Sequence, residues 1–424
     1  MEVSKEFRAK VLQELTVCPL IPSSMRSLKK PDPFPVFEER DSCLVVPRFW
    51  ARERLGLPVP GADLPVPRLQ PEPAFLGALR PQQEEVAAEL EGLLRRELGA
   101  VLTLPCGFGK TCVAIYLITR LCAKTLVVVH KEFLMEQWRA SLARFTDCSV
   151  GVIRQRVEDV KDRHVVVAMA QSLSRRSYAS LGSFDFLVVD EVHNMATRCF
   201  SKVLLKAGGA RFTLGLSATP ERPDGLSKVF RWFLGAQSVR KERPPLRLEV
   251  RTVRYTGVRP VIDFRGEMNL AATLTALSEE GPRNRRIVEE VEGLLRSSAG
   301  RNVLVLSSRI RQLRALQEAL SASSVHAALY VGGTSKEELK QAEQARVLLA
   351  TYEMVNEGFD LPKLNVVVFA TPRSRVEQAV GRILRNPNPE LVPVVVDVVD
   401  EKPPMFLGQH KQRQKYYQSV VASA

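Results

Sequence analysis

Residues Val101-Leu-Thr-Leu-Pro-Cys-Gly-Phe-Gly-Lys-Thr111 carry the clearest structural pattern of the chain. Its first four residues form an apolar run that predicts a strand, and a helical pattern follows Thr111. Gly107 and Gly109 permit a tight turn that points main-chain N–H groups at an anion, and the helix N-terminus adds the positive end of its dipole. A strand, a Gly-rich turn and a helix in this order are typical of a phosphate-binding loop.

The end of this loop indicates what it binds. Lys110 can reach the β- and γ-phosphates of a nucleotide, and the Thr111 hydroxyl can ligate Mg²⁺. The usual first glycine of such loops is absent, since Leu104 stands in its place. We expect a nucleotide to be held by Leu104, Pro105, Cys106, Gly107, Phe108, Gly109, Lys110 and Thr111. The alternative is a plain Gly-rich turn.

A second apolar run, Phe184-Asp-Phe-Leu-Val-Val-Asp-Glu-Val-His193, ends in two carboxylates. A buried parallel strand that delivers Asp190 and Glu191 at its carboxyl end places both beside the phosphate loop. Asp190 is expected to hold Mg²⁺, directly or through water, and Glu191 to orient and deprotonate an attacking water. The alternative is that this acidic pair only caps a strand.

Composition bounds the rest of the chain. Its 424 residues allow two or three domains, and 61 Lys and Arg against 47 Asp and Glu give a net charge of +14. Such a basic chain favours nucleic acid as a partner over an anionic membrane. No apolar run spans a bilayer, and Met1 to Pro19 lack signal-peptide features, so we expect an intracellular protein that is not secreted. Seven cysteines without a Cys-x-x-Cys pair argue against disulfides or zinc.

Short β-rich runs alternate with helical stretches from Leu79 onward, which predicts an α/β fold with parallel sheets covered by helices on both faces. Proline-rich residues 1–75 are expected to form a small extension packed on the neighbouring domain. We predict a first domain at 76–240, a basic linker at 241–285, a second domain at 286–402 and a basic tail at 403–424.

With Ser217-Ala-Thr-Pro220 after the box Asp190-Glu-Val-His193, the chain resembles superfamily 2 helicases and translocases. The resemblance continues in order through the chain. It includes Leu79-Arg-Pro-Gln-Gln83, Val127-Val-Val-His-Lys131 with Gln137 and Trp138, Ala168-Met-Ala-Gln-Ser172, Val303-Leu-Val-Leu-Ser307, Ala350-Thr-Tyr-Glu-Met-Val-Asn-Glu-Gly-Phe-Asp360 and Gln378-Ala-Val-Gly-Arg-Ile-Leu-Arg385. It implies two tandem RecA-like domains that use ATP and Mg²⁺.

The resemblance also implies roles for residues outside the phosphate loop. Arg80 and Gln83 match the adenine-recognising motif, and Gly358 and Asp360 fall in the motif that contacts nucleotide from the second domain. Arg385 matches the arginine finger, Arg382 contacts the γ-phosphate, and Gln378 pairs with His193. Ser217, Ala218 and Thr219 match the motif that couples hydrolysis to movement. The nucleic-acid track would include Lys131, Gln171, Ser172, Ser308, Arg309 and Thr351.

Within the superfamily the chain is most similar to XPB-like translocases and to helicases of large cytoplasmic DNA viruses, including poxvirus- and iridovirus-type transcription helicases. This resemblance implies a motor acting on DNA, with 3′ to 5′ polarity, in the cytoplasm or nucleus of a host cell. Transcription or replication machinery is then a candidate partner. The alternatives are an RNA-directed helicase and an ATP-gated clamp that does not unwind. A restriction-type subunit is a distant fourth, because the sequence shows no nuclease or methyltransferase motif.

Overall fold

The structure is a computed structural model of the chain. It describes residues 5–20, 31–40, 43–60, 68–105, 107–195, 197–218, 222, 224–241, 247–356, 359, 361–384 and 391–421. Five of the predicted site residues lie outside this part of the chain, namely Cys106, Thr219, Gly358, Asp360 and Arg385. The chain divides into two compact units, Met1–Glu242 and Arg243–Ala424, and each is built on its own parallel sheet.

The sheet of the first unit confirms the predicted parallel arrangement. Its strands lie in the order β12-β5-β11-β10-β6-β9-β7-β8, and only β8 runs antiparallel to its neighbour. The strands are β5 (Gly99–Thr103), β6 (Thr125–Val129), β7 (Val150–Arg154), β8 (Val157–Glu158), β9 (Val165–Met169), β10 (Phe186–Val189), β11 (Phe212–Ser217) and β12 (Ser238–Arg240). Strands β5, β6, β10 and β11 are buried along their whole length, as expected for a sheet covered on both faces.

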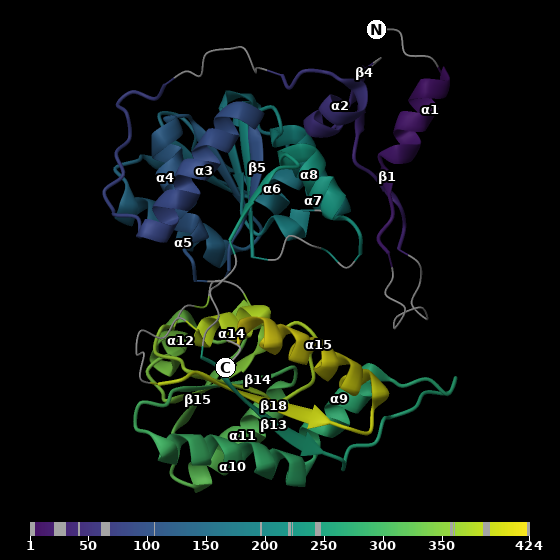
Figure 1. Cartoon of the computed structure of the whole chain (residues 1–424), viewed down its shortest axis with the longest axis vertical. Coiled ribbons are helices and arrows are strands. Elements are labelled where there is room, and N and C mark those ends of the chain that lie inside the picture. Colours follow the sequence, from purple (N-terminus) through teal and green to yellow (C-terminus); the bar gives the residue numbers. More distant parts are fainter. Residues whose placement is uncertain are drawn as a thin grey trace. The chain divides into compact units, whose positions relative to one another are not determined.

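Helices cover both faces of this sheet (Figure 1). Ala100 and Leu102 of β5 belong to the apolar cluster that includes α3, α4 and α5, whereas Val101 belongs to the cluster that includes α7 and α8. This alternation is the period of two that a strand imposes on its side chains. The helical segments are α3 (Pro81–Glu97), α4 (Lys110–Leu121), α5 (Glu132–Phe145), α6 (Ala170–Arg175), η2 (Ala179–Ser183), η3 (Val192–Met195), α7 (Arg198–Ala207) and α8 (Ser227–Leu234).

The N-terminal residues pack onto this first unit. They form α1 (Lys5–Glu14), β1 (Thr16–Val17), β2 (Phe34–Pro35), β3 (Glu38–Arg40), β4 (Cys43–Val45) and α2 (Arg48–Leu55). Leu15, Val36 and Trp50 join the cluster on one face of the sheet. The Arg48 guanidinium is buried and donates to the carbonyl oxygens of Leu98 and Ala210, and burial lowers its pKa to about 9. The segment is therefore anchored to the sheet by a buried cation.

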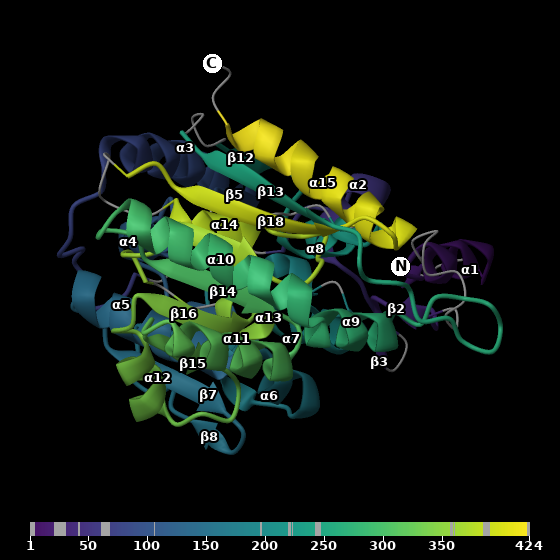
Figure 2. The same ribbon diagram turned by 90° about the horizontal axis from the view of Figure 1, so that it is seen from below.

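The second unit contains an all-parallel sheet in the order β13-β18-β17-β14-β16-β15 (Figure 2). Its strands are β13 (Glu249–Tyr255), β14 (Val303–Ser307), β15 (Ala327–Tyr330), β16 (Val347–Thr351), β17 (Val366–Phe369) and β18 (Val394–Asp400). Its helices are α9 (Leu270–Glu279), α10 (Gly281–Ser297), α11 (Ile310–Ala322), α12 (Lys336–Ala342), α13 (Tyr352–Asn356), α14 (Glu377–Ile383) and α15 (Pro404–Val420). One apolar cluster includes α10 and α11, and the other includes α13, α14 and α15.

Two predicted segments differ from this arrangement. The expected linker 241–285 contains β13, which pairs with β18 along seven residues, and the helix α9. The expected basic tail 403–424 contains α15, whose residues Phe406 and Tyr417 are buried. The basic composition of both segments concealed these elements, because charged residues flank the few buried apolar side chains and two of the arginines, Arg283 and Arg413, are themselves buried. Both segments are parts of the second unit.

A buried ion cluster attaches α15 to the sheet. Arg413 of α15 contacts both carboxylate oxygens of Asp397 in β18, at 2.7 and 3.0 Å. His410 Nδ1 lies 3.0 Å from the same carboxylate. Burial alone raises the pKa of Asp397, but the hydrogen bond from His410 and the charge of Arg413 lower it below its ordinary value. The Asp397 charge is therefore compensated by side chains of α15.

Replacement of Arg413 by Met should destabilise the second unit strongly. The change leaves the Asp397 carboxylate buried without its main counter-charge, which costs about 3–5 kcal/mol of unfolding free energy. Arg254→Met is the matched control, because Arg254 pairs with Glu401 at an exposed position and such pairs contribute at most about 1 kcal/mol. Urea denaturation, with hydrogen exchange of the β18 amides as the probe, measures the loss of unfolding free energy in each variant. Equal losses of unfolding free energy in the two variants would contradict the stabilising role of the buried Arg413–Asp397 pair.

Candidate ATP site and nucleic-acid contacts

The predicted phosphate loop lies between β5 and α4, as the sequence indicates. Gly107 and Gly109 have φ angles of 85° and 96°, which L side chains rarely adopt, and Gly109 caps α4. A Cβ atom added to Gly109 would lie 2.4 Å from Nε2 of Gln83. The turn therefore requires glycine at this position for two reasons, the backbone conformation and the space available.

Arg80 and Gln83 hold the loop in place from the start of α3. Gln83 Nε2 donates to the carbonyl oxygen of Phe108 at 2.8 Å, and its Oε1 accepts from the Arg80 N–H at 2.9 Å. The Arg80 guanidinium donates to the same Phe108 oxygen. The structure thus connects both predicted adenine-motif residues to the phosphate loop, and their contact with adenine stays a prediction.

Lys110 and Thr111 open α4 with the chemistry that a triphosphate needs. Lys110 Nζ donates to the carbonyl oxygen of Leu104 at 3.1 Å, so the ammonium folds back across the loop. Both residues are half-buried at the helix N-terminus, where the dipole favours an anion. An ammonium group, main-chain N–H groups and a hydroxyl fit the phosphates and one Mg²⁺ ligand of a bound nucleotide.

Asp190 follows β10 and lies almost completely buried. Its Oδ2 accepts from the indole N–H of Trp138 at 2.8 Å, and its Oδ1 accepts from the Glu191 main-chain N–H at 2.9 Å. Burial and the neighbouring Glu191 charge raise the pKa of Asp190 to about 6, against the opposing effects of Trp138 and Lys110. A buried carboxylate opposite a lysine is a ligand for a hard cation, which fits the predicted role in Mg²⁺ binding.

Glu191, His193 and Ser217 form a polar chain beside Asp190. Glu191 has a φ of 47°, an uncommon value for a residue with a side chain and one that the surrounding structure must hold. Its Oε2 lies 3.4 Å from His193 Nδ1, and the same nitrogen lies 3.2 Å from the Ser217 hydroxyl. The predicted catalytic carboxylate is therefore connected to the predicted coupling motif, with Ala218 next in the chain.

Three strands explain this convergence. The phosphate loop follows β5, Ser217 ends β11, and Asp190 follows β10; these strands are adjacent and parallel in the order β5-β11-β10. Their carboxyl ends meet at one edge of the sheet, which is where open α/β sheets bind ligands. The phosphate loop, the acidic pair and the motif that starts at Ser217 therefore lie at one edge of the sheet.

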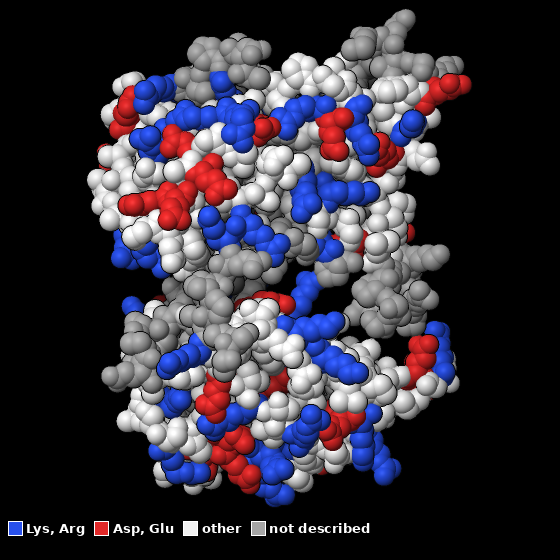
Figure 3. Space-filling model, in the orientation of Figure 1, with Lys and Arg blue, Asp and Glu red and all other residues white. Residues whose placement is uncertain are grey.

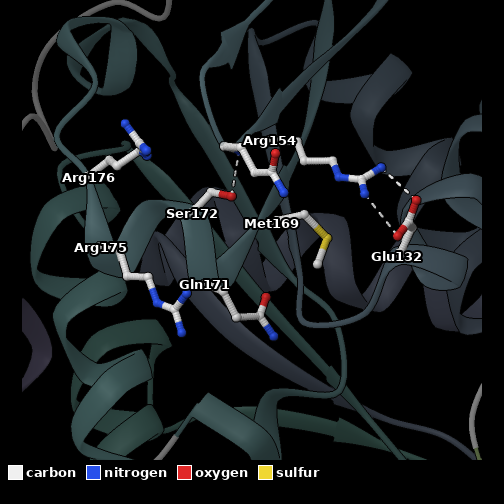
Figure 4. Close-up of a pocket in the computed structure, with 8 residues that line it drawn as sticks. Glu132, Arg154, Met169, Gln171, Ser172, Arg175 and Arg176 are labelled. Atoms are coloured by element: carbon white, nitrogen blue, oxygen red, sulfur yellow. Dashed lines mark hydrogen bonds and ion pairs between the residues drawn. The ribbon is translucent and has the colours of Figure 1, made fainter.

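Two predicted nucleic-acid residues of the first unit, Gln171 and Ser172, line a pocket with a volume of about 480 Å³ (Figure 4). Gln171 Nε2 donates to the His130 carbonyl at 2.6 Å, and Ser172 Oγ accepts from the Gln155 N–H at 2.8 Å. The pocket is also lined by Glu132, Arg154, Gln155, Met169, Arg175 and Arg176. Lys131 precedes α5 and lies 5.8 Å from the centre of the Phe133 ring.

The sequence prediction missed the arginines of this pocket. Arg175 and Arg176 are exposed, whereas Arg154 forms a double contact with Glu132 at 2.6 and 3.0 Å. A sequence signal was available for Arg175 and Arg176, because they lie only three and four residues after the end of the Ala168–Ser172 motif. For Arg154, nothing in the sequence indicates that its strand borders that motif.

In the second unit, Ser308 and Thr351 lie together at the carboxyl ends of β14 and β16, whose last residues are register partners. Arg309 has a structural role there. It donates to the carbonyl oxygens of Ala271 and Ser308 at 2.9 and 3.1 Å and to Thr275 Oγ1 at 3.1 Å, so it braces α9 against α11. Its predicted contact with nucleic acid stays a prediction.

Gln378 and Arg382 lie on α14, and Arg382 is buried with its Nε donating to the Val355 carbonyl at 3.3 Å. Their predicted roles in ATP hydrolysis stay predictions. Trp50, Trp138 and Trp232 are all buried.

Comparisons with known proteins find one matching family model in each unit. The family model described as "Type III restriction enzyme, res subunit" matches residues 76–222, and "Helicase conserved C-terminal domain" matches residues 286–387. A protein of Acanthamoeba polyphaga mimivirus, named as an ATP-dependent RNA helicase, is 31% identical over 98% of this chain and 82% of its own length. A protein of Invertebrate iridescent virus 6, named as a helicase, is 28% identical over 81% of this chain and 80% of its own length.

Among solved structures, the Hef helicase domain of Pyrococcus furiosus matches with a TM-score of 0.53 at 17% identity. The match covers 80% of this chain and 98% of that domain, and it supports a fold of two RecA-like domains. In the described part of the chain, no helix has both the length and the apolar character needed to cross a membrane.

Replacement of Trp138 by Phe should shift the pH dependence of Mg²⁺·ATP binding. The ionised form of Asp190, which is the form expected to hold Mg²⁺, becomes populated as the pH rises through about 6. Loss of the Trp138 hydrogen bond removes an interaction that lowers this pKa, so the midpoint should rise by about one to two units. Calorimetric titrations between pH 5 and 8 measure the midpoint. An unchanged midpoint in Trp138→Phe, or an equal shift in the buried control Trp232→Phe, would contradict this role.

Proposed function

We propose that the chain, which belongs to the superfamily 2 helicases and is related to viral helicases, couples ATP hydrolysis to movement along DNA or to its unwinding. The observation that carries this proposal is the convergence of Lys110, Asp190 and Ser217 at the ends of three adjacent parallel strands. One edge of one sheet then carries a phosphate-binding group, a cation ligand and the start of the coupling motif.

The chain's own residues account for the proposed reaction. The loop amides and Lys110 would position the triphosphate, and Thr111 and Asp190 would hold Mg²⁺, whose charge offsets that of the phosphates. Glu191 would accept a proton from the attacking water, and His193 fixes the direction of that carboxylate through its 3.4 Å contact. Little covalent chemistry is left to the protein, so positioning and charge account for most of the catalysis.

Residues of the second unit complete this proposal by resemblance. Gln378, Arg382 and Arg385 match the motif that includes the arginine finger, and Gly358 and Asp360 match the motif that senses nucleotide. Ser217 and its neighbours would pass the state of the nucleotide to the nucleic-acid contacts. Those contacts are proposed at Lys131, Gln171, Ser172, Ser308, Arg309 and Thr351.

DNA is the proposed track, and RNA is the second candidate. The family model that matches the first unit is described as the res subunit of a type III restriction enzyme, and the sequence resembles helicases of large DNA viruses. The mimivirus relative, however, is named as an RNA helicase. Contacts to phosphates serve either polymer. Transcription or replication machinery in the cytoplasm or nucleus of a host cell is the proposed setting.

Glu191→Gln should abolish stimulated ATP hydrolysis. Loss of the general base costs about 100-fold or more in turnover, whereas the isosteric amide keeps the fold. Steady-state hydrolysis should be measured without polymer and with single-stranded DNA, double-stranded DNA and RNA. Glu72→Gln is the control, because Glu72 pairs with Arg68 on the surface. Stimulation by RNA alone would replace DNA as the track, and tight ATP-dependent binding with negligible turnover would favour the clamp.

Ser217→Ala should separate hydrolysis from movement. The change removes the hydroxyl that lies 3.2 Å from His193 but leaves Lys110, Asp190 and Glu191 in place. Loss of one hydrogen bond is worth about 0.5–1.5 kcal/mol. The length of strand displaced per ATP hydrolysed should therefore fall by about two- to tenfold. Paired measurements of ATP turnover and duplex separation test this, with the exposed Ser183→Ala as control. An equal fall in both activities would assign Ser217 to hydrolysis itself.

A further inference from the structure

An arm of residues 256–269 connects β13 to α9 and carries an exposed aromatic ring. Phe264 is 91% exposed, the largest value among the bulky apolar side chains of the described residues, and Ile262 is 52% exposed. Figures 1 and 2 show the arm extending from the second unit beside α9. Phe264 and Ile262 therefore expose apolar area close together on the arm, which makes the arm a candidate contact surface.

The arm is ordered by its own hydrogen bonds. The Asp263 carboxylate accepts from the main-chain N–H groups of Arg265 and Glu267, at 2.9 and 3.0 Å. Gly266 turns the chain with a φ of 79°, and the Asn269 N–H closes the arm on the Val261 carbonyl at 2.8 Å. Phe264 is therefore presented at the tip of a preformed turn, which lowers the entropy lost on binding.

The base of the arm is fixed to the unit. Val258 is buried with Leu277 and Phe406 in a small apolar cluster. The Val261 N–H donates to Oγ1 of the buried Thr273 at 3.0 Å, which ties the arm to α9. The position of Phe264 is therefore fixed relative to the rest of the second unit.

The arm also starts at the edge where the proposed nucleic-acid contacts of this unit lie. Strand β13 ends at Tyr255, which is the register partner of Asp400, so the arm leaves from the carboxyl edge of the parallel sheet. Ser308 and Thr351 lie at that same edge. Arg309 donates to Ala271 and Thr275 of α9, the helix that follows the arm.

The chemistry of the tip favours stacking over charge. The arm contains two arginines, Arg259 and Arg265, and two acids, Asp263 and Glu267, so its formal charge is zero. The Arg265 guanidinium lies over the Phe264 ring, 5.1 Å from its centre, and both side chains are exposed. A nucleobase with a free face matches such a surface, and an unpaired base offers one.

We infer that Phe264 stacks on an unpaired base of the nucleic acid bound by the second unit, so that the arm recognises single-stranded segments. The inference rests on the proposed function and adds a contact that is independent of the ATP site. Because the arm carries no net charge, its contribution to binding is expected to be insensitive to salt, unlike contacts to phosphates.

The test compares binding of the full-length wild type, Phe264→Ala, Phe264→Trp and Ile262→Ala to short fluorescein-labelled oligothymidylate, oligouridylate and blunt duplex DNA. Stacking is worth a factor of about 5 to 150 per base, so Phe264→Ala should weaken single-strand binding within that range. Phe264→Trp should restore binding, and blunt-duplex binding should not change. The slope of affinity against salt should equal that of the wild type.

Ile262→Ala is the matched control, because it removes exposed apolar surface from the same arm without removing a ring. Equal weakening by Ile262→Ala and Phe264→Ala would overturn stacking in favour of a general apolar contact. Unchanged single-strand binding in Phe264→Ala would overturn the inference. If the wild type itself binds none of the three probes, the proposed function fails rather than this inference alone. Circular dichroism confirms that each variant is folded.

Discussion

The main-chain pairing of β11 between β5 and β10 is the constraint on which the candidate site depends. A parallel ladder fixes its strands in register, and here it sets Ser217 beside Thr103 and Gly215 beside Val189. Every residue that follows these strands then emerges at one edge. The turn at Gly109, the buried Asp190 and the strained Glu191 each have a local cost, and the all-apolar strands beneath them compensate for that cost through burial on both faces.

Some of the positive charge of this chain lies in its interior, on buried arginines, and does not act on a partner. Arg48, Arg283 and Arg413 lie in the interior, where they bind main-chain carbonyls or the carboxylates of Asp400 and Asp397. Arginine suits these positions because its planar group forms several fixed hydrogen bonds. Part of the net charge therefore stabilises the fold. On the face shown in Figure 3, basic and acidic side chains are mixed over both units. Net charge alone thus predicts a partner less directly than motif positions do.

Much of the fold could be predicted from the sequence because its central strands are uninterrupted apolar runs. Strand β5 (Gly99–Thr103) overlaps the apolar run Val101–Leu104, and β10 lies within the run that starts at Phe184. Strand β13 could not be predicted in the same way, since an edge strand with alternating charged residues resembles a basic linker. The candidate site followed from motif spacing, but the contacts of its side chains did not. Only the folded structure shows that Arg309 braces a helix or that Trp138 bonds to Asp190.

The bond between the Trp138 indole and the Asp190 carboxylate has an optical consequence. Indole emission responds to the charge and polarity next to its N–H group, and this indole donates to the carboxylate that is expected to hold the cation. Trp50 and Trp232, the other two tryptophans of the chain, belong to the apolar cluster on one face of the first sheet. The proposed ATP site therefore has an intrinsic fluorophore beside its buried carboxylate, and a change in Trp138 emission on addition of nucleotide would report binding there without a label.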